Sequence, residues 1–105
     1  MTDHRKLLEN AAKAAWIELG WNRNDSPPKP FRLDTVHWWN PITDDGDEAR
    51  LEAALKMSPV WEDAYVYIQG YPDIIELYAD HNGDKQAARR MAGTRAAEAI
   101  GEKMP

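Results

Sequence analysis

The sequence predicts an α+β fold, in which a small antiparallel β-sheet built around a hairpin is layered with three α-helices. Residues 3–19 and 84–100 carry apolar side chains at helical spacing, whereas Val60 to Ala79 alternates with the period of a strand. Polar loops rich in Pro, Gly, Asn and Asp separate these segments. An isolated hairpin is only marginally stable in water, so we expect helices to cover it.

The first expected element is an amphipathic helix over residues 3–19, which Gly20 would end in a left-handed conformation with Trp21 packing behind it. Its buried face would consist of Leu8, Ala11, Ala12, Ala15 and Leu19. Residues 22–30 are rich in proline and predict an extended loop that forms neither a helix nor a central strand. A short strand is expected within Phe31–Trp39.

The second half predicts a short helix, a hairpin and a long helix. The short helix follows residues 43–48 and stops at Ser58-Pro59. Alternation over 64–68 predicts one strand, residues 70–73 a turn, and residues 74–79 the second strand. Asp84 is expected to start the last helix, and Gly101 to stop it after Ile100. Its core stripe would comprise Ala88, Met91, Ala92, Ala96 and Ala99.

The chain of 105 residues fits one domain over 1–105, with 1–3 and 102–105 expected to fray. The absence of cysteine excludes disulfides, thiol nucleophiles and thiolate metal sites. The net charge of −5 disfavours direct nucleic-acid binding, which depends on Lys and Arg. The sequence has neither an apolar run of about 20 residues nor a signal-type stretch, so we expect a soluble cytoplasmic protein without membrane contact.

Charge is distributed unevenly along the chain. Residues 33–64 hold eight acidic and two basic residues, a net charge of −6, whereas residues 81–105 hold five basic and three acidic residues, a net of +2. The acidic middle would suit a basic partner surface, and the basic last helix a small anion. The other interpretation is that these opposite charges are neighbours in the fold.

Five tryptophans are too many for the core of so short a chain. Trp16 and Trp61 are expected to fill the core. If the segment around Trp38 and Trp39 is extended, their side chains point to opposite faces, so one of them should lie near solvent. Exposed tryptophans are common anchors of protein interfaces.

The acidic loop 43–48 has two interpretations. Asp45 would cap the second helix, with Glu48 completing a capping box, or the clustered acids would bind a hard cation. The spacing lacks the alternation of a calcium loop, so we favour the cap and predict no metal site or cofactor. His37 and His81 each adjoin acidic residues, but neither belongs to a hydrolase motif, so no catalytic residue and no enzyme activity is predicted.

Arg95 falls inside the arc of the alanine stripe of the last helix, where a guanidinium needs a partner. It would pack its stem and reach a carboxylate or carbonyl at the sheet edge. Alternatively, Arg90 and Arg95 would hold a phosphate or carboxylate together in a cleft.

Two segments of the chain carry a family resemblance. They are Trp39-Asn40-Pro41-Ile42-Thr43-Asp44-Asp45-Gly46-Asp47 with Arg50-Leu51, and Gly83-Asp84 with Ala87-Ala88, Arg90, Ala92, Arg95-Ala96-Ala97 and Ile100-Gly101. Both resemble small phage-encoded proteins of the "phage ABA sandwich" type. The resemblance implies an α-β-α layered domain, phage or prophage origin and expression in the host cytoplasm. Members of this type are mostly of unknown function, so it implies no mechanism.

These observations favour a non-catalytic phage accessory protein that inhibits a host protein with a basic surface. The contact would be an acidic, Trp-rich surface containing Trp38, Trp39, Asp44, Asp45 and Asp47. One alternative is a sponge that binds a nucleotide-type anion through Arg90 and Arg95. A second is a metal-assisted phosphoesterase using residues 44–47 with His37 or His81. A homodimer is left open.

Overall fold

The predicted α+β class is confirmed by a computed structural model, which describes residues 4–24 and 28–104. Within those residues, three α-helices combine with a two-stranded and a three-stranded antiparallel sheet. The elements in chain order are α1 (Arg5–Ala14), β1 (Leu19–Asn22), β2 (Lys29–Arg32), α2 (Asp45–Leu55), β3 (Pro59–Trp61), β4 (Tyr65–Ile68), β5 (Tyr71–Leu77), the 3-10 helix η1 (Tyr78–His81) and α3 (Lys85–Glu102).

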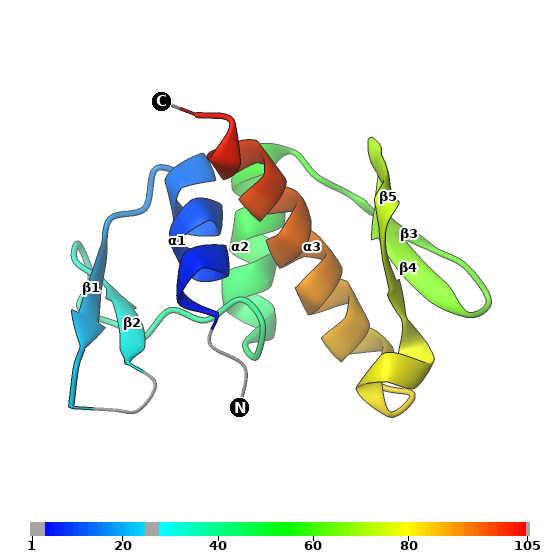
Figure 1. Ribbon diagram of the computed structural model, residues 1–105, viewed down its shortest axis with the longest axis horizontal. Coiled ribbons are helices and arrows are strands. Elements are labelled where there is room, and N and C mark those ends of the chain that lie inside the picture. The colour runs from blue at the N-terminus through cyan, green and yellow to red at the C-terminus, as the bar shows by residue number, and fades with distance from the viewer. Residues whose placement is uncertain (1–3, 25–27, 105) are drawn as a thin grey trace.

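Helix α3 lies at the centre of the fold (Figure 1). One side of it packs against α1 and α2, and the other side against β4 and β5 of the three-stranded sheet, whose order is β3-β4-β5. The β1–β2 ribbon lies beyond α1, at the opposite end of the molecule from that sheet (Figure 1). The two ends are therefore separate surfaces joined by three helices.

Small residues bring α1 and α3 close together. Ala11, Ala88 and Ala92 are fully buried. A Cβ atom on Gly101 would lie 1.9 Å from the carbonyl oxygen of Asn10 on α1. The prediction that Gly101 stops the last helix is therefore wrong: α3 continues to Glu102, and the glycine is there for close helix packing.

The first helix ends earlier than predicted. Ala14 is its last residue, and Trp16 rather than Gly20 takes the left-handed conformation, with φ +59°. The amide of Trp16 donates to the Lys13 carbonyl at 3.1 Å, and that of Ile17 to the Ala12 carbonyl at 2.9 Å. These two bonds define a Schellman motif with tryptophan at the position that glycine usually occupies.

The ribbon occupies part of the predicted proline-rich loop. Lys29–Arg32 pairs with Leu19–Asn22 in a ribbon of two strands, so the prediction of a loop over 22–30 is wrong at both ends, whereas the prediction that this segment forms no central strand is confirmed for the described residues; residues 25–27 lie outside the described part. The chain then turns at Val36 (φ +57°) and returns along β2 through a Phe31–Trp38 bridge. The strand predicted within Phe31–Trp39 is thus a strand end, a turn and a bridge.

The hairpin alternation is confirmed where it faces α3. Val66 and Ile68 are fully buried, and Tyr65 and Tyr67 lie half-buried on the other sheet face. The turn is tighter than predicted, because Gly70 adopts φ +93° and β5 already begins at Tyr71. Strand β3, which pairs with β4, was not predicted.

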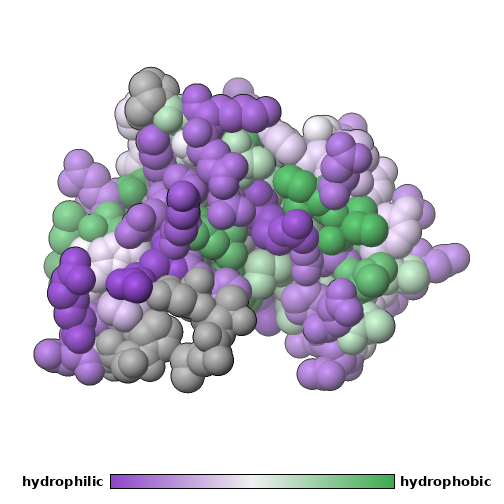
Figure 2. Space-filling model, in the orientation of Figure 1, coloured by the Kyte–Doolittle hydropathy of each residue, from purple (hydrophilic) through white to green (hydrophobic). Residues whose placement is uncertain are grey.

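Hydrophobic residues also reach the surface on the side of the molecule where the sheet lies (Figure 2). Ile75 and Leu77 on β5 are 41% and 40% exposed. Among the described residues, no helix has the length and apolar character needed to cross a membrane.

Candidate functional site

The tryptophans divide between core and surface differently from the prediction. Trp39 is the largest fully buried side chain, at 2% exposure, whereas Trp38 is 59% exposed. The expectation that one of this pair lies near solvent is confirmed. The expectation that Trp16 and Trp61 fill the core is wrong, because they are 85% and 43% exposed.

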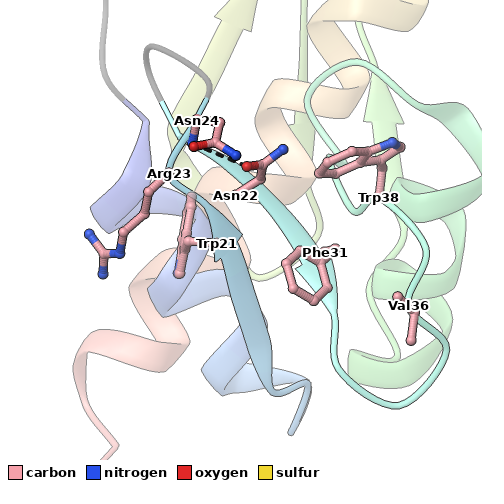
Figure 3. Close-up of a pocket in the computed structure, with 7 residues that line it drawn as sticks. All are labelled: Trp21, Asn22, Arg23, Asn24, Phe31, Val36 and Trp38. Atoms are coloured by element: carbon pink, nitrogen blue, oxygen red, sulfur yellow. Dashed lines mark hydrogen bonds between the residues drawn. The ribbon is translucent and has the colours of Figure 1, made fainter.

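Trp38 borders a hollow on the ribbon with a volume of about 540 Å³ (Figure 3). The residues lining this ribbon hollow are Trp21, Asn22, Arg23, Asn24, Phe31, Val36 and Trp38. Its volume lies within the range of pockets that hold small molecules or a projecting side chain.

The strand register explains why aromatic rings gather there. Phe31 pairs with Gly20 on β1 and bridges to Trp38 on its other side, so the three positions share one face of the ribbon. A Cβ on Gly20 would lie 2.5 Å from the Phe31 ring, so the missing side chain of Gly20 leaves room for that ring beside the strand. Phe31 and Trp38 then meet edge to face, with ring centroids 6.2 Å apart.

Val36 and Lys29 complete the rim around Trp38. Val36 is 73% exposed although its backbone is left-handed, a conformation that is a genuine outlier for a β-branched residue. The ammonium of Lys29 lies 5.9 Å from the Trp38 ring centroid. Sequence reasoning missed Val36 and Phe31; the signal available was the pair Asp34-Thr35, which are turn-forming residues directly after a strand.

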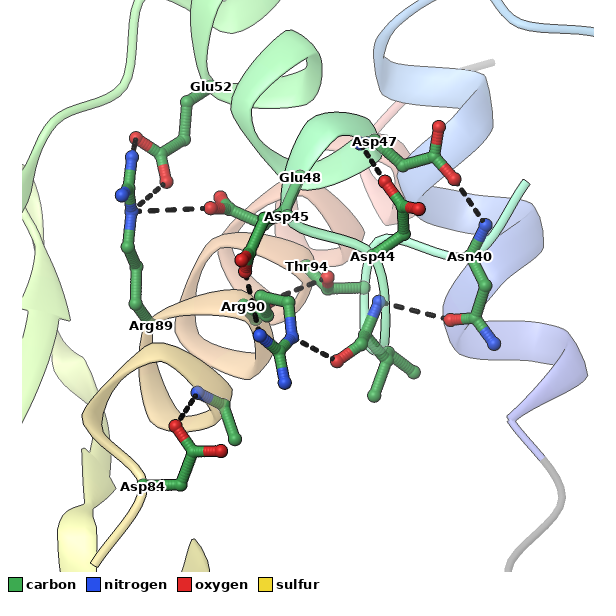
Figure 4. A network of polar contacts seen from close by, with 12 residues as sticks. Asn40, Asp44, Asp45, Asp47, Glu48, Glu52, Asp84, Arg89, Arg90 and Thr94 are labelled. Atoms are coloured by element: carbon green, nitrogen blue, oxygen red, sulfur yellow. Dashed lines mark hydrogen bonds and ion pairs between the residues drawn. The ribbon is translucent and has the colours of Figure 1, made fainter.

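The acidic residues of α2 face the arginines of α3, and we call this group the α2–α3 seam (Figure 4). Its members are Asp45, Glu48, Glu52, Arg89 and Arg90. Arg89 donates to both carboxylate oxygens of Glu52, at 2.9 and 3.0 Å, and lies 3.3 Å from Glu48 Oε1. Such paired bonds from one guanidinium are among the stronger polar contacts in proteins.

Glu48 is the most unusual member of the seam. It is 1% exposed, and its Oε2 has no hydrogen-bond partner among the described residues. A Cβ on Gly93 would lie 2.2 Å from Oε2, so the absent side chain of Gly93 makes room for the carboxyl. Burial, followed by the neighbouring Glu52, raises the pKa of Glu48 to about 9. The fold therefore favours the protonated form of Glu48.

The acidic loop caps α2, but one residue earlier than predicted. Asp44, not Asp45, is the N-cap and accepts from the Asp47 amide at 2.8 Å. Asp47 is 8% exposed and accepts from the Asn40 amide and from Arg50. Glu48 does not complete a capping box, because its side chain points into the α2–α3 seam toward Arg89. Asp45 remains exposed and pairs with Arg90 at 2.7 Å.

Arg90 and Arg95 do not meet in a cleft. Arg90 donates to the Ile42 carbonyl at 2.8 Å and to Asp45, whereas Arg95 donates to Glu76 on β5 and to the Ile75 carbonyl. The interpretation that Arg95 reaches a carboxylate and a carbonyl of the sheet is confirmed.

The residues of the predicted metal alternative are also apart. His81 Nε2 lies 2.8 Å from Glu76 Oε1, on the sheet side, and His37 is exposed on the ribbon. Within residues 4–24 and 28–104, no three His, Asp or Glu side chains are grouped so as to hold a metal ion.

Of the five residues predicted to form the partner surface, Trp38, Asp44 and Asp45 are exposed, and Trp39 and Asp47 are buried. Trp39 and Asp47 therefore belong to the interior. No family model, curated protein or solved structure matches the chain.

Proposed function

We propose that this protein acts by binding, without catalysis, and that its contact surface is the ribbon hollow around Trp38. The observation that carries the proposal is the rim, where Val36 and Trp38 are exposed next to the half-buried ring of Phe31. Tryptophans flanked by an apolar pocket are frequent energetic anchors of protein interfaces.

Backbone strain at Val36 supports a binding role. A left-handed conformation at a β-branched residue costs on the order of 1–3 kcal/mol, and such strain concentrates at ligand clamps and active sites. The Val36 amide donates to the Arg32 carbonyl at 2.8 Å, so a tight turn holds the side chain outward. Because Val36 is 73% exposed, its packing within the fold offers little to offset the strain.

The placement of the acidic residues decides how much negative charge remains for a partner to contact. Asp47, Glu48 and Glu52 are buried, and Asp45 pairs with Arg90, so much of the acidic middle is neutralised inside the protein. The exposed Asp44 and the net charge of −5 support a host protein with a basic surface as the proposed partner. The internal partners of Arg90 and Arg95 lend no support to the nucleotide alternative.

The resemblance to phage proteins extends the proposal to the biological setting. A phage accessory protein of this kind would inhibit a host protein in the host cytoplasm by covering part of its surface. The ribbon hollow, about 540 Å³, would receive one projecting apolar side chain of that host protein.

The proposal is tested by capture from a bacterial lysate with immobilised wild-type protein and two variants. Trp38→Ala should lose the captured protein. Trp61→Ala is the matched control, since it removes a 43% exposed indole from the opposite end of the molecule, and it should retain the captured protein. Circular dichroism verifies that both variants are folded. Equal capture by wild type and folded Trp38→Ala would refute the ribbon hollow as the contact surface.

A further inference from the structure

A second hollow, of about 640 Å³, lies between the C-terminal end of α1, the segment leading into β1, and Met104. Its apolar wall is formed by Ala12, Trp16, Ile17, Leu19, Trp21 and Met104. We call it the α1 hollow. It shares only Trp21 with the ribbon hollow, and the register places Trp21 on the ribbon face opposite Phe31 and Trp38.

Trp16 stands at the rim of this hollow without filling it. Its side chain is 85% exposed, the highest exposure among the large hydrophobic residues described. It also occupies the left-handed position of the Schellman motif, where glycine would be free of strain. A strained backbone therefore presents a large aromatic ring to solvent beside an open apolar hollow.

In a two-fold symmetric contact, the same patch of each copy faces the patch of the other copy. Each patch must therefore offer both a ring that inserts and a hollow that receives the ring of the other copy. A different partner would need only one of the two features. We propose that this protein forms a two-fold dimer in which Trp16 of each copy inserts into the α1 hollow of the other.

The charged rim of the α1 hollow fits the same arrangement. Lys13 and Glu18 are both exposed and line the hollow with opposite charges. A two-fold axis that brings Lys13 of one copy to Glu18 of the other forms this ion pair twice. Lys13 donates to the Met104 carbonyl at 2.9 Å, which leaves two of its three N–H donors for the second copy.

Sedimentation equilibrium over a wide concentration range tests the proposal. Wild type should rise from one to two times the mass of the chain with increasing concentration. Trp16→Gly should stay at the mass of one chain and melt at a higher temperature when both proteins are monomeric, because glycine relieves the left-handed strain. Trp38→Ala should dimerise like wild type, which separates this surface from the proposed function.

Charge reversal at the rim is the second measurement. Lys13→Glu and Glu18→Lys should each weaken the dimer, and the double variant should restore it. A wild type that stays monomeric at every concentration overturns the proposal. So does a Trp16→Gly variant that still dimerises, or a dimer that only Trp38→Ala abolishes.

Discussion

The α2–α3 seam and the ribbon hollow place their side chains in opposite ways. In the seam, ionisable groups are inside: Glu48 and Glu52 are 1% and 6% exposed, and Arg89 contacts both of them. At the ribbon hollow, large apolar groups are outside: Val36 and Trp38 are 73% and 59% exposed. Each region reverses the usual preference of its residues.

This difference in burial indicates a structural role for the seam and supports the proposed binding role for the ribbon hollow. Buried charges persist only where partners compensate them, so the seam is a fold-holding contact between two helices. Exposed apolar residues on a strained turn contribute little to folding, which supports the proposed role of the ribbon hollow in contact with another molecule. Substitutions in the seam should therefore change stability, and those at the ribbon should change binding.

Removing the Arg89 guanidinium, which contacts both Glu48 and Glu52, should have the largest effect. Arg89→Met leaves the buried Glu52 carboxylate without its two guanidinium bonds, and breaking a buried pair in this way costs about 3 kcal/mol or more. Urea unfolding measures the loss. Arg50→Met is the control, since Arg50 is 67% exposed and its loss should cost about 0.5 kcal/mol. Equal losses in the two variants would contradict a structural role for the seam.

Filling the space beside Glu48 should have the next largest effect. Gly93→Ala places a methyl group against the carboxyl, and overpacking of this kind costs about 2 kcal/mol. Combining it with Glu48→Ala removes the clashing atoms. The double variant should thus be less destabilised than the sum of the single changes, as measured by the same unfolding experiment. Strict additivity would show that the two residues are not in contact.

The raised pKa of Glu48 predicts a pH dependence of stability. Its pKa rises from 4.5 to about 9 on folding, so the folded state binds the proton more tightly than the unfolded state. The Glu48 contribution is therefore fully present below pH ~4.5 and lost as pH rises toward ~9. Glu48→Gln should flatten this fall in unfolding free energy while staying within about 1 kcal/mol of wild type at pH 5. An unchanged slope would mean that Glu48 is ionised in the fold.

Relieving the ribbon turn should have the smallest effect, with the opposite sign. Val36→Gly removes the left-handed strain and should raise the free energy of unfolding by about 1 kcal/mol. The same variant should bind its partner more weakly, because the apolar rim is lost. Thermal melting and lysate capture on one protein sample check both effects. A less stable variant would mean that Val36 supports the fold.

Local signals in the sequence predicted the elements whose ends depend on local chemistry. Asp84 starts α3 as expected, since its side chain accepts from the Ala87 amide at 3.0 Å. The hairpin followed from the alternation that ends in the buried Val66 and Ile68. By contrast, the general preference for glycine at the left-handed position after a helix predicts that the first helix ends at Gly20, whereas Trp16 takes that position.

The candidate sites were predicted less completely because they depend on contacts distant in sequence. Glu48 on a helix is normally read as exposed, and only Arg89 and Gly93, far along the chain, explain its burial. The exposed Trp38 was anticipated as one of an alternating pair. Its neighbour Phe31 was not, because the bridge between them forms only after a turn at Val36 that the sequence rules disfavour.

The central claim is that the α2–α3 seam stabilises the fold, whereas the exposed Trp38 of the ribbon hollow contributes little to stability. The most direct test compares the unfolding free energy of Trp38→Ala with that of Arg89→Met. Trp38 is 59% exposed, so its loss should cost about 1 kcal/mol or less, against about 3 kcal/mol for Arg89. A loss for Trp38→Ala equal to or larger than that for Arg89→Met would contradict the account.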